Sequence, residues 1–160
     1  MPVTATPVFA QTSNVGAFNA LLSTAMTSTA AFDGTQAVGT SMALIFTAGS
    51  NGSRVDQVTC RYSSLNGTTA SSFSSQSVIR FWINNGAANT NAANNTFFGE
   101  VLMAGTSVQS LSSSVLTPNY LPLPTGGLNL PAGYRLYAGS TIAAGGINIA
   151  FAVNAIGGDY

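Results

Sequence analysis

Closely spaced turn signals divide this chain into runs of strand length. Glycine beside asparagine, aspartate or serine recurs along most of the sequence, and these residue types supply the positive φ angles and local hydrogen bonds of tight turns. Several runs between the signals alternate apolar and polar side chains with a period of two, which is typical of half-buried β-strands. The turn signals lie at residues 33–34, 49–52, 66–67, 84–86, 126–127, 145–146 and 157–158.

The most regular alternation lies at residues 55–62, where the apolar face is centred on Cys60. Residues 41–48 alternate in the same way, with Leu44 and Phe46 on one face and Ile45 on the other. Because only a short glycine-containing loop separates these two runs, they are expected to pair with each other as a β-hairpin.

Residues 77–84 carry apolar bulk on both faces, with Phe81 on one and Trp82 on the other, which predicts a strand that is covered on both sides. Residues 96–104 form the next strand, with an interruption expected near Gly99. Residues 119–124 belong at a sheet edge, because the prolines in this segment cannot donate to a ladder of hydrogen bonds. The remaining expected strands are 128–136, 147–156 and a less regular one within 19–27.

No run has a convincing helical period. Residues 14–26 could form a short capped helix, but their Ser, Thr and β-branched content favours a strand or an arm. Many short strands without crossover helices predict an all-β fold: an antiparallel β-sandwich, jelly-roll-like, of about eight strands. We assign residues 19–160 to this domain. Residues 1–18 contain two prolines and no charge, and we expect an extended N-terminal arm there.

Charge is the scarcest property of the chain. Four arginines and four acidic residues make up 5% of 160 residues, with no lysine or histidine, whereas 19 Ser, 18 Thr and 14 Asn supply an uncharged polar surface. A cationic footprint for nucleic acid is therefore lacking. No apolar run is long enough to span a bilayer, and the N-terminus lacks the charged start of a secretory signal. Because 46% of the residues are hydrophobic, we expect a folded domain.

The residue types that perform catalysis are few and scattered. Asp33, Asp56, Glu100 and Asp159 are the only carboxylates, and nothing in the sequence forces two of them across a cleft, as a glycosidase requires. Cys60 has no histidine to activate it and is expected to be a buried thiol. We therefore predict no enzyme, no cofactor and no metal ligands. The sequons at Asn51, Asn66 and Asn94 are interpreted as chance occurrences.

Two features suggest binding. The amide-rich segment of residues 84–95 separates two apolar strands, and its side chains are either solvated or packed on a neighbour. The low charge leaves little repulsion between copies of the chain, which suits an ordered assembly. A sandwich with aromatic side chains such as Trp82, Tyr134 or Tyr137 on its surface could instead be a carbohydrate-binding module.

Several segments together resemble small virion proteins of tailed bacteriophages and prophages. They cover most of the chain after residue 30 and consist of turn and strand patterns. They are FDGT at 32–35, FTAGSNGSRVDQV at 46–58, FWINNG at 81–86, AANTNAANN at 87–95, FFGEVLM at 97–103, LPAGYRLYAGST at 130–141 and AIGGDY at 155–160.

The resemblance implies a β-sandwich structural component of the particle, with a capsid decoration or cement protein as the leading hypothesis. Its partners would be the major capsid protein and its own copies, expected as a homotrimer on the capsid exterior. Clustering around a local threefold axis would let copies gain from avidity. A tail or baseplate component is the alternative within the same class. Neither nucleic acid nor a membrane is an expected partner.

Overall fold

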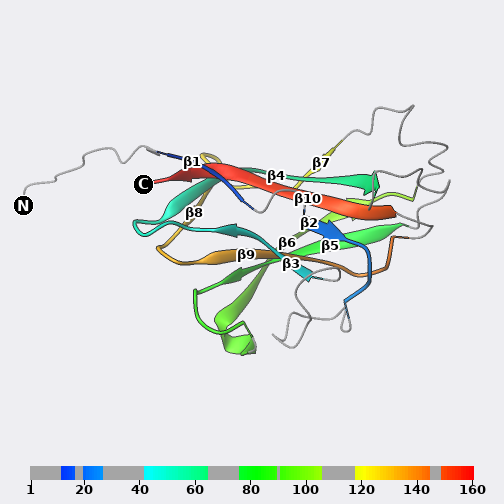
Figure 1. Ribbon diagram of the computed structural model, residues 1–160, viewed down its shortest axis with the longest axis horizontal. Helices are drawn as coiled ribbons and strands as arrows, with labels where there is room; N and C mark the ends of the chain where they lie inside the picture. Colours follow the sequence, from blue (N-terminus) through cyan, green and yellow to red (C-terminus); the bar gives the residue numbers. More distant parts are fainter. Residues whose placement is uncertain are drawn as a thin grey trace, which may run out of the picture.

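The strands of the computed structural model pair into two antiparallel sheets that form the two layers seen in Figure 1. The structure describes residues 12–16, 20–26, 42–64, 76–89, 91–105, 118–144 and 149–160. The elements in these residues are β1 Thr12–Val15, β2 Ala20–Leu22, β3 Met42–Thr47, β4 Ser53–Ser64, β5 Ser77–Asn84, the 3₁₀ turn η1 Ala92–Asn94, β6 Asn95–Met103, β7 Asn119–Tyr120, β8 Leu128–Leu130, β9 Arg135–Ser140 and β10 Ile149–Asp159.

The strand order is that of a jelly roll. One sheet runs β1-β10-β4-β7, with β2 also paired to β10 and β8 also paired to β4, and the other runs β3-β9-β5-β6. Since β1 and β2 follow one another along β10, and β7 and β8 along β4, each couple is one interrupted strand. Eight strands in chain order then give sheets 1-8-3-6 and 2-7-4-5, two interlocked Greek keys. The predicted all-β antiparallel sandwich is confirmed.

One apolar core fills the space between the sheets. Phe46, Phe81 and Leu136 enter it from the four-stranded sheet, while Cys60 and Phe151 enter it from the other. The alternation predicted around Cys60 is confirmed, because Val58, Cys60 and Tyr62 are buried between more exposed neighbours. The double coverage predicted for residues 77–84 is confirmed as well: Phe81 belongs to the core, and Trp82 is 1% exposed on the outer face.

The predicted hairpin between residues 41–48 and 55–62 is wrong. β3 pairs with β9, whereas β4 pairs with β10, β7 and β8, so the loop at 49–52 carries the chain from one sheet to the other. Its tight turn is real, with Gly52 at φ 91° and its N–H bonded to the Gly49 carbonyl at 3.1 Å. A short glycine turn fits either connection, and the pairing is decided by which distant strands fill the neighbouring positions.

β-Bulges interrupt three of the ladders, and one of them overturns a predicted alternation. In β3 an irregularity at Ile45 turns both Ile45 and Phe46 into the core, so Phe46 does not share a face with Leu44. In the β5–β6 ladder the extra residue is Phe98, next to the interruption expected near Gly99. In the β4–β10 ladder it is Asp56. Each bulge reverses the facing of the residues beyond it, which a strict period of two cannot express.

Two expected strands have different boundaries. The run at 128–136 is divided between β8 and β9, in different sheets, by a turn in which the Tyr134 N–H donates to the Pro131 carbonyl at 3.1 Å and Gly133 adopts φ 73°. The run at 147–156 extends to Asp159, because the 157–158 glycine pair lies within β10 instead of forming a turn. The predicted edge position of residues 119–124 is confirmed for the described strand β7, which pairs with β4.

The β-sandwich domain begins earlier in the chain than the predicted residue 19. Residues 12–15, which the sequence assigns to the arm, form β1 and pair with residues 156–159 of β10. The strand expected within 19–27 is confirmed as β2. Gly16 lies next to β1, where a Cβ would overlap the carbonyl oxygen of Ile45, so the chain passes close to β3 at this point. Residues 1–11 of the predicted arm lie outside the described residues.

Candidate functional site

Three connections and the C-terminal residues meet at one end of the sandwich, which we call the loop end: residues 49–52, 84–95, 131–134 and 157–160 (Figure 1). Close backbone approaches join them. A Cβ on Gly52 would lie 2.9 Å from the Leu130 carbonyl oxygen, and one on Gly86 would lie 2.9 Å from that of Gly133. The Tyr160 N–H donates to the Gly52 carbonyl at 3.1 Å. The loop end is therefore a continuous surface.

Asp159 binds the two termini of the described domain together. Its carboxylate accepts hydrogen bonds from the Ser53 hydroxyl and from the Asn14 side-chain amide, the latter at 2.6 Å. The same Asn14 amide donates to the Thr47 carbonyl at 3.0 Å, and the Gly49 N–H donates to the Ser53 hydroxyl oxygen at 2.8 Å. This network, which we call the Asp159 clasp, joins β1, β10 and both sides of the 49–52 loop.

The clasp favours the charged form of its carboxyl group. The Ser53 hydroxyl, then the Asn14 amide and the Gly49 N–H, lower the pKa of Asp159 below its ordinary value, and partial burial opposes them. Donors aimed at an ionised oxygen stabilise the anion relative to the neutral acid. All of these donors are uncharged side chains or backbone, so the clasp is a structural bond and not an acid–base pair.

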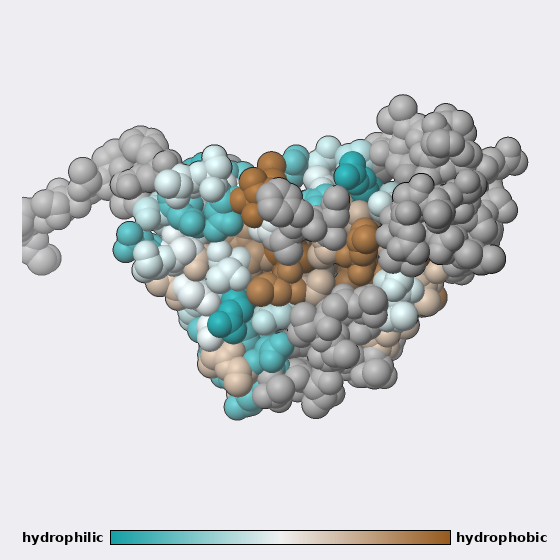
Figure 2. All heavy atoms as spheres, in the orientation of Figure 1, coloured by the Kyte–Doolittle hydropathy of each residue, from teal (hydrophilic) through white to brown (hydrophobic). Residues whose placement is uncertain are grey.

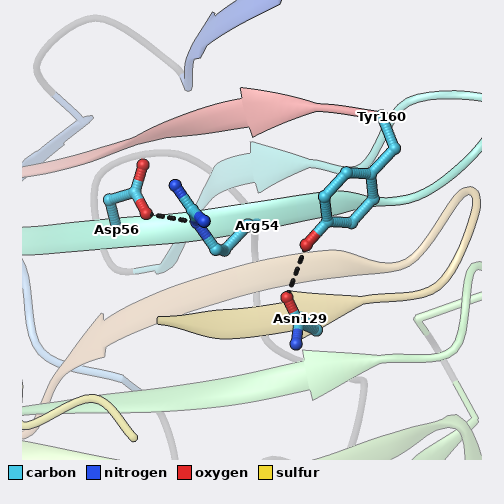
Figure 3. Close-up of polar contacts among 4 residues, drawn as sticks. All are labelled: Arg54, Asp56, Asn129 and Tyr160. Atoms are coloured by element: carbon cyan, nitrogen blue, oxygen red, sulfur yellow. Dashed lines mark hydrogen bonds and ion pairs between the residues drawn. The ribbon is translucent and has the colours of Figure 1, made fainter. Parts of the chain in front are cut away.

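Two polar pairs lie on the outside of the six-stranded sheet beside the clasp (Figure 3). The Arg54 Nε donates to Asp56 at 2.6 Å, with both side chains exposed. The Tyr160 hydroxyl donates to Asn129 on β8 at 2.6 Å. The Asp56 carboxylate raises the pKa of the Arg54 guanidinium above its ordinary value. In each pair the two side chains bond to each other.

In the amide-rich segment at 84–95, asparagines from the two legs of the hairpin bond to one another. Asn84 donates to the Asn95 side-chain oxygen at 2.9 Å, and Asn85 donates to that of Asn94 at 3.2 Å, forming two rungs between the legs of the hairpin. We call this arrangement the asparagine ladder.

The other ends of these side chains are also used. The side-chain oxygens of Asn84, Asn85 and Asn91 accept the N–H groups of Gly86, Ala87 and Ala93. The Asn94 amide donates to the Ala88 carbonyl at 2.8 Å, and the Asn95 amide donates to the carbonyls of Asn89 and Asn91. Arg135 reaches the Ala87 carbonyl at 3.5 Å. The loop thus closes on its own hydrogen bonds.

The outer face of the four-stranded sheet carries a second apolar cluster. Met26, Trp82 and Tyr137 are buried there, with Leu44 packed against them. Phe97 meets the Trp82 ring edge-on, with centroids 6.1 Å apart, and is itself 53% exposed. Leu102, further along β6, is 55% exposed. Figure 2 shows brown, apolar surface gathered in the middle of the molecule between teal regions.

The residues considered for catalysis are not brought together. Cys60 is a buried thiol, as expected, and burial raises its pKa to about 12. Asp56 lies in the six-stranded sheet, whereas Glu100 lies in the other sheet and faces Arg80 at 3.5 Å. Asp33 is outside the described residues. Within those residues, no three His, Cys, Asp or Glu side chains gather as metal ligands, and no helix is long and apolar enough to cross a membrane.

The aromatic residues proposed for stacking on sugars are mostly inaccessible. Trp82 and Tyr137 are 1% and 5% exposed, so the expectation that they lie on the surface is wrong, and Tyr134 is half-buried. Of the sequons, Asn51 is exposed, but the Ser53 hydroxyl beside it is buried in the clasp. Asn94 is held in the ladder, and Asn66 lies outside the described part of the chain.

The ladder and the clasp are features that sequence reasoning missed. For the ladder, the asparagines at both ends of the 84–95 loop could have predicted the pairing, because amides can hydrogen-bond across a hairpin. The clasp had no local signal, since its members come from three distant parts of the chain. Comparison with protein-family models, with curated proteins and with solved structures finds no match to this chain.

Proposed function

We propose that this protein is a structural component of a tailed-phage virion, a decoration or cement protein on the capsid exterior. In this role it binds the major capsid protein and stabilises the shell by lattice contacts, without catalysing a reaction. The observation that carries the proposal is a jelly roll with an almost uncharged surface, since eight charged side chains serve 160 residues. Jelly rolls recur in virion proteins, and low charge permits close packing of copies.

Three further observations support a binding role. The loop end is a continuous surface tied by its own hydrogen bonds. Large apolar side chains are exposed on both sheets, including Phe97 and Leu102 on β6 and the paired Val15 and Ile156 on β1 and β10. The candidate nucleophile Cys60 is buried, and Asp56 and Glu100 lie in different sheets. A fold alone does not define a function, so the proposal requires a direct test.

Quantitative mass spectrometry of purified particles is that test. A decoration protein should be present in amounts comparable with the major capsid protein, and analytical ultracentrifugation of the isolated protein should show the proposed homotrimer. A few copies per particle would instead indicate a tail or baseplate component. Complete absence from particles would refute both placements, and binding on a glycan array would support a carbohydrate-binding module.

A further inference from the structure

The asparagine ladder changes what the 84–95 loop presents to its surroundings. The side-chain amides of Asn84, Asn85, Asn94 and Asn95 are occupied at both ends within the loop. The backbone also bonds to itself: the Asn94 carbonyl accepts from Asn85 at 3.0 Å, and that of Ala88 accepts from Asn91 at 3.3 Å. The side-chain amides of these four asparagines, at the two ends of the loop, are therefore already bonded within it.

Small apolar groups remain on the outside of this loop. Ala87, Ala88 and Ala93 are exposed, and Phe97 follows at the start of β6. No charged residue occurs between Arg80 and Glu100. The β5–β6 hairpin projects from the body of the sandwich at the lower edge of Figure 1.

We infer that residues 84–89 and 91–95, together with Phe97, are the element by which this protein docks on its shell, and that the partner surface is neutral and apolar. This inference rests on the proposed function and assigns the contact within it. Covering the four asparagines whose amides are already bonded within the loop leaves none of those amides unsatisfied, so their desolvation costs little. A loop fixed by its own rungs also loses little conformational freedom on binding. The sequence from residue 81 to residue 99 carries no charge that could complement a charged or nucleic-acid partner.

Added charge at the tip is the sharpest test. Ala88→Glu and Ala93→Glu each place a carboxylate on exposed surface without removing a bond of the ladder. Both variants should melt at the parental temperature and bind particles assembled without this chain roughly tenfold more weakly, or worse. The matched control is Gln57→Glu, which adds the same charge at an exposed position of β4 in the other sheet and should bind like the parent.

Loosening the ladder tests the contribution of rigidity. Asn85→Ala removes the rung to Asn94 and the cap on the Ala87 N–H but leaves the exposed methyl groups in place. Amide hydrogen exchange should speed up within the loop alone, and particle binding should weaken while the melting temperature stays close to that of the parent.

The outcomes separate this inference from the proposed function. If the parent binds particles and both glutamate variants bind equally well, the loop is not the contact, and the virion role stands. If the variants lose binding while Gln57→Glu does not, the inference holds. If the parent itself does not bind particles assembled without it, the virion role fails, and the docking inference fails with it.

Discussion

Asp159 shows how one side chain can hold distant parts of a chain together. Its carboxylate, on β10, accepts hydrogen bonds from the Ser53 hydroxyl on β4 and from the Asn14 side-chain amide on β1. Hydrogen bonds to an ionised group are about twice as strong as those between neutral groups. The contribution of Asp159 to stability therefore depends on its ionisation.

We predict that the clasp makes stability sensitive to acid. Because folding lowers the pKa of Asp159, its contribution is present above the pKa of the unfolded chain and is lost as the pH falls through the folded value, below about pH 4. Asp159→Asn should reduce the free energy of unfolding at pH 7 by about 1 to 3 kcal/mol and flatten its dependence on pH in this range. Urea unfolding at a series of pH values from about 2 to about 7 measures both effects.

The control for this prediction is Asp56→Asn, which removes an exposed carboxylate paired with Arg54. An exposed ion pair is screened by solvent and contributes little to stability, so this variant should keep most of the acid sensitivity of the parent. Parallel stability curves for the parent and Asp159→Asn would show that the clasp carries no charge-dependent stability.

Gly157 is required by a close approach of two backbones. A Cβ at this position would overlap the carbonyl oxygen of Arg54 on the neighbouring strand. Gly157→Ala should therefore cost about 3 kcal/mol or more, because backbone must move to accept it. Gly126→Ala is the comparison: that glycine has φ 90° and open space around it, so only conformational strain of about 1 kcal/mol is expected. Equal melting temperatures for the two variants would contradict this account.

At the scale of elements, the interrupted strand formed by β1 and β2 decides where the domain begins. β1 pairs along the end of β10, and Asn14 bonds to both Asp159 and the Thr47 carbonyl. β2 continues along β10 through Leu22, which is fully buried. The segment is thus an edge of the six-stranded sheet and is fixed by backbone pairing as well as by its side chains.

Truncation from the N-terminus should reveal this boundary. Removing residues 1–11 should leave the free energy of unfolding nearly unchanged, because β1 begins at Thr12. Removing residues 1–16 should lower it by about 2 kcal/mol or more, because the β1 ladder and both hydrogen bonds donated by the Asn14 amide are lost. Urea unfolding followed by circular dichroism measures both. A large loss on removing only residues 1–11 would place part of that segment in the folded domain.

At the scale of the whole molecule, the two sheets share one core, and Cys60 lies inside it. Tyr62, two residues from Cys60 on the same face of β4, packs against Phe151 on β10, with ring centroids 5.2 Å apart. A reagent can reach Cys60 only if the layers separate or the β4–β10 ladder opens. The single cysteine of the chain is therefore a natural reporter of how cooperatively the sandwich unfolds.

We predict that the Cys60 thiol is unreactive in the native protein. Its pKa is raised to about 12, so almost no thiolate is present near neutral pH, and its side chain is fully buried. Labelling with a chromogenic disulfide should be very slow in buffer and rapid in denaturant. Its rate at intermediate urea should follow global unfolding. Fast labelling under native conditions would show that the core opens locally at β4.

The sequence by itself determined the fold class, most of the strands and the poverty of charge. Period-two alternation around Cys60 and Phe81 follows from which side chains must leave water, and this information is local. The sequence could also have predicted that the 84–95 loop closes by its own amides, since all members of the ladder lie within twelve residues in sequence.

Only the tertiary structure decided the pairing and the facing of the strands. The sequence predicts that residues 41–48 and 55–62 form a hairpin, but β9 and β10 take the neighbouring positions from the far end of the chain. The bulges at Ile45 and Asp56, the glycine pair inside β10 and the Asp159 clasp share this origin. Each depends on atoms that meet after more than eighty residues of intervening chain, and a local pattern carries no record of such contacts.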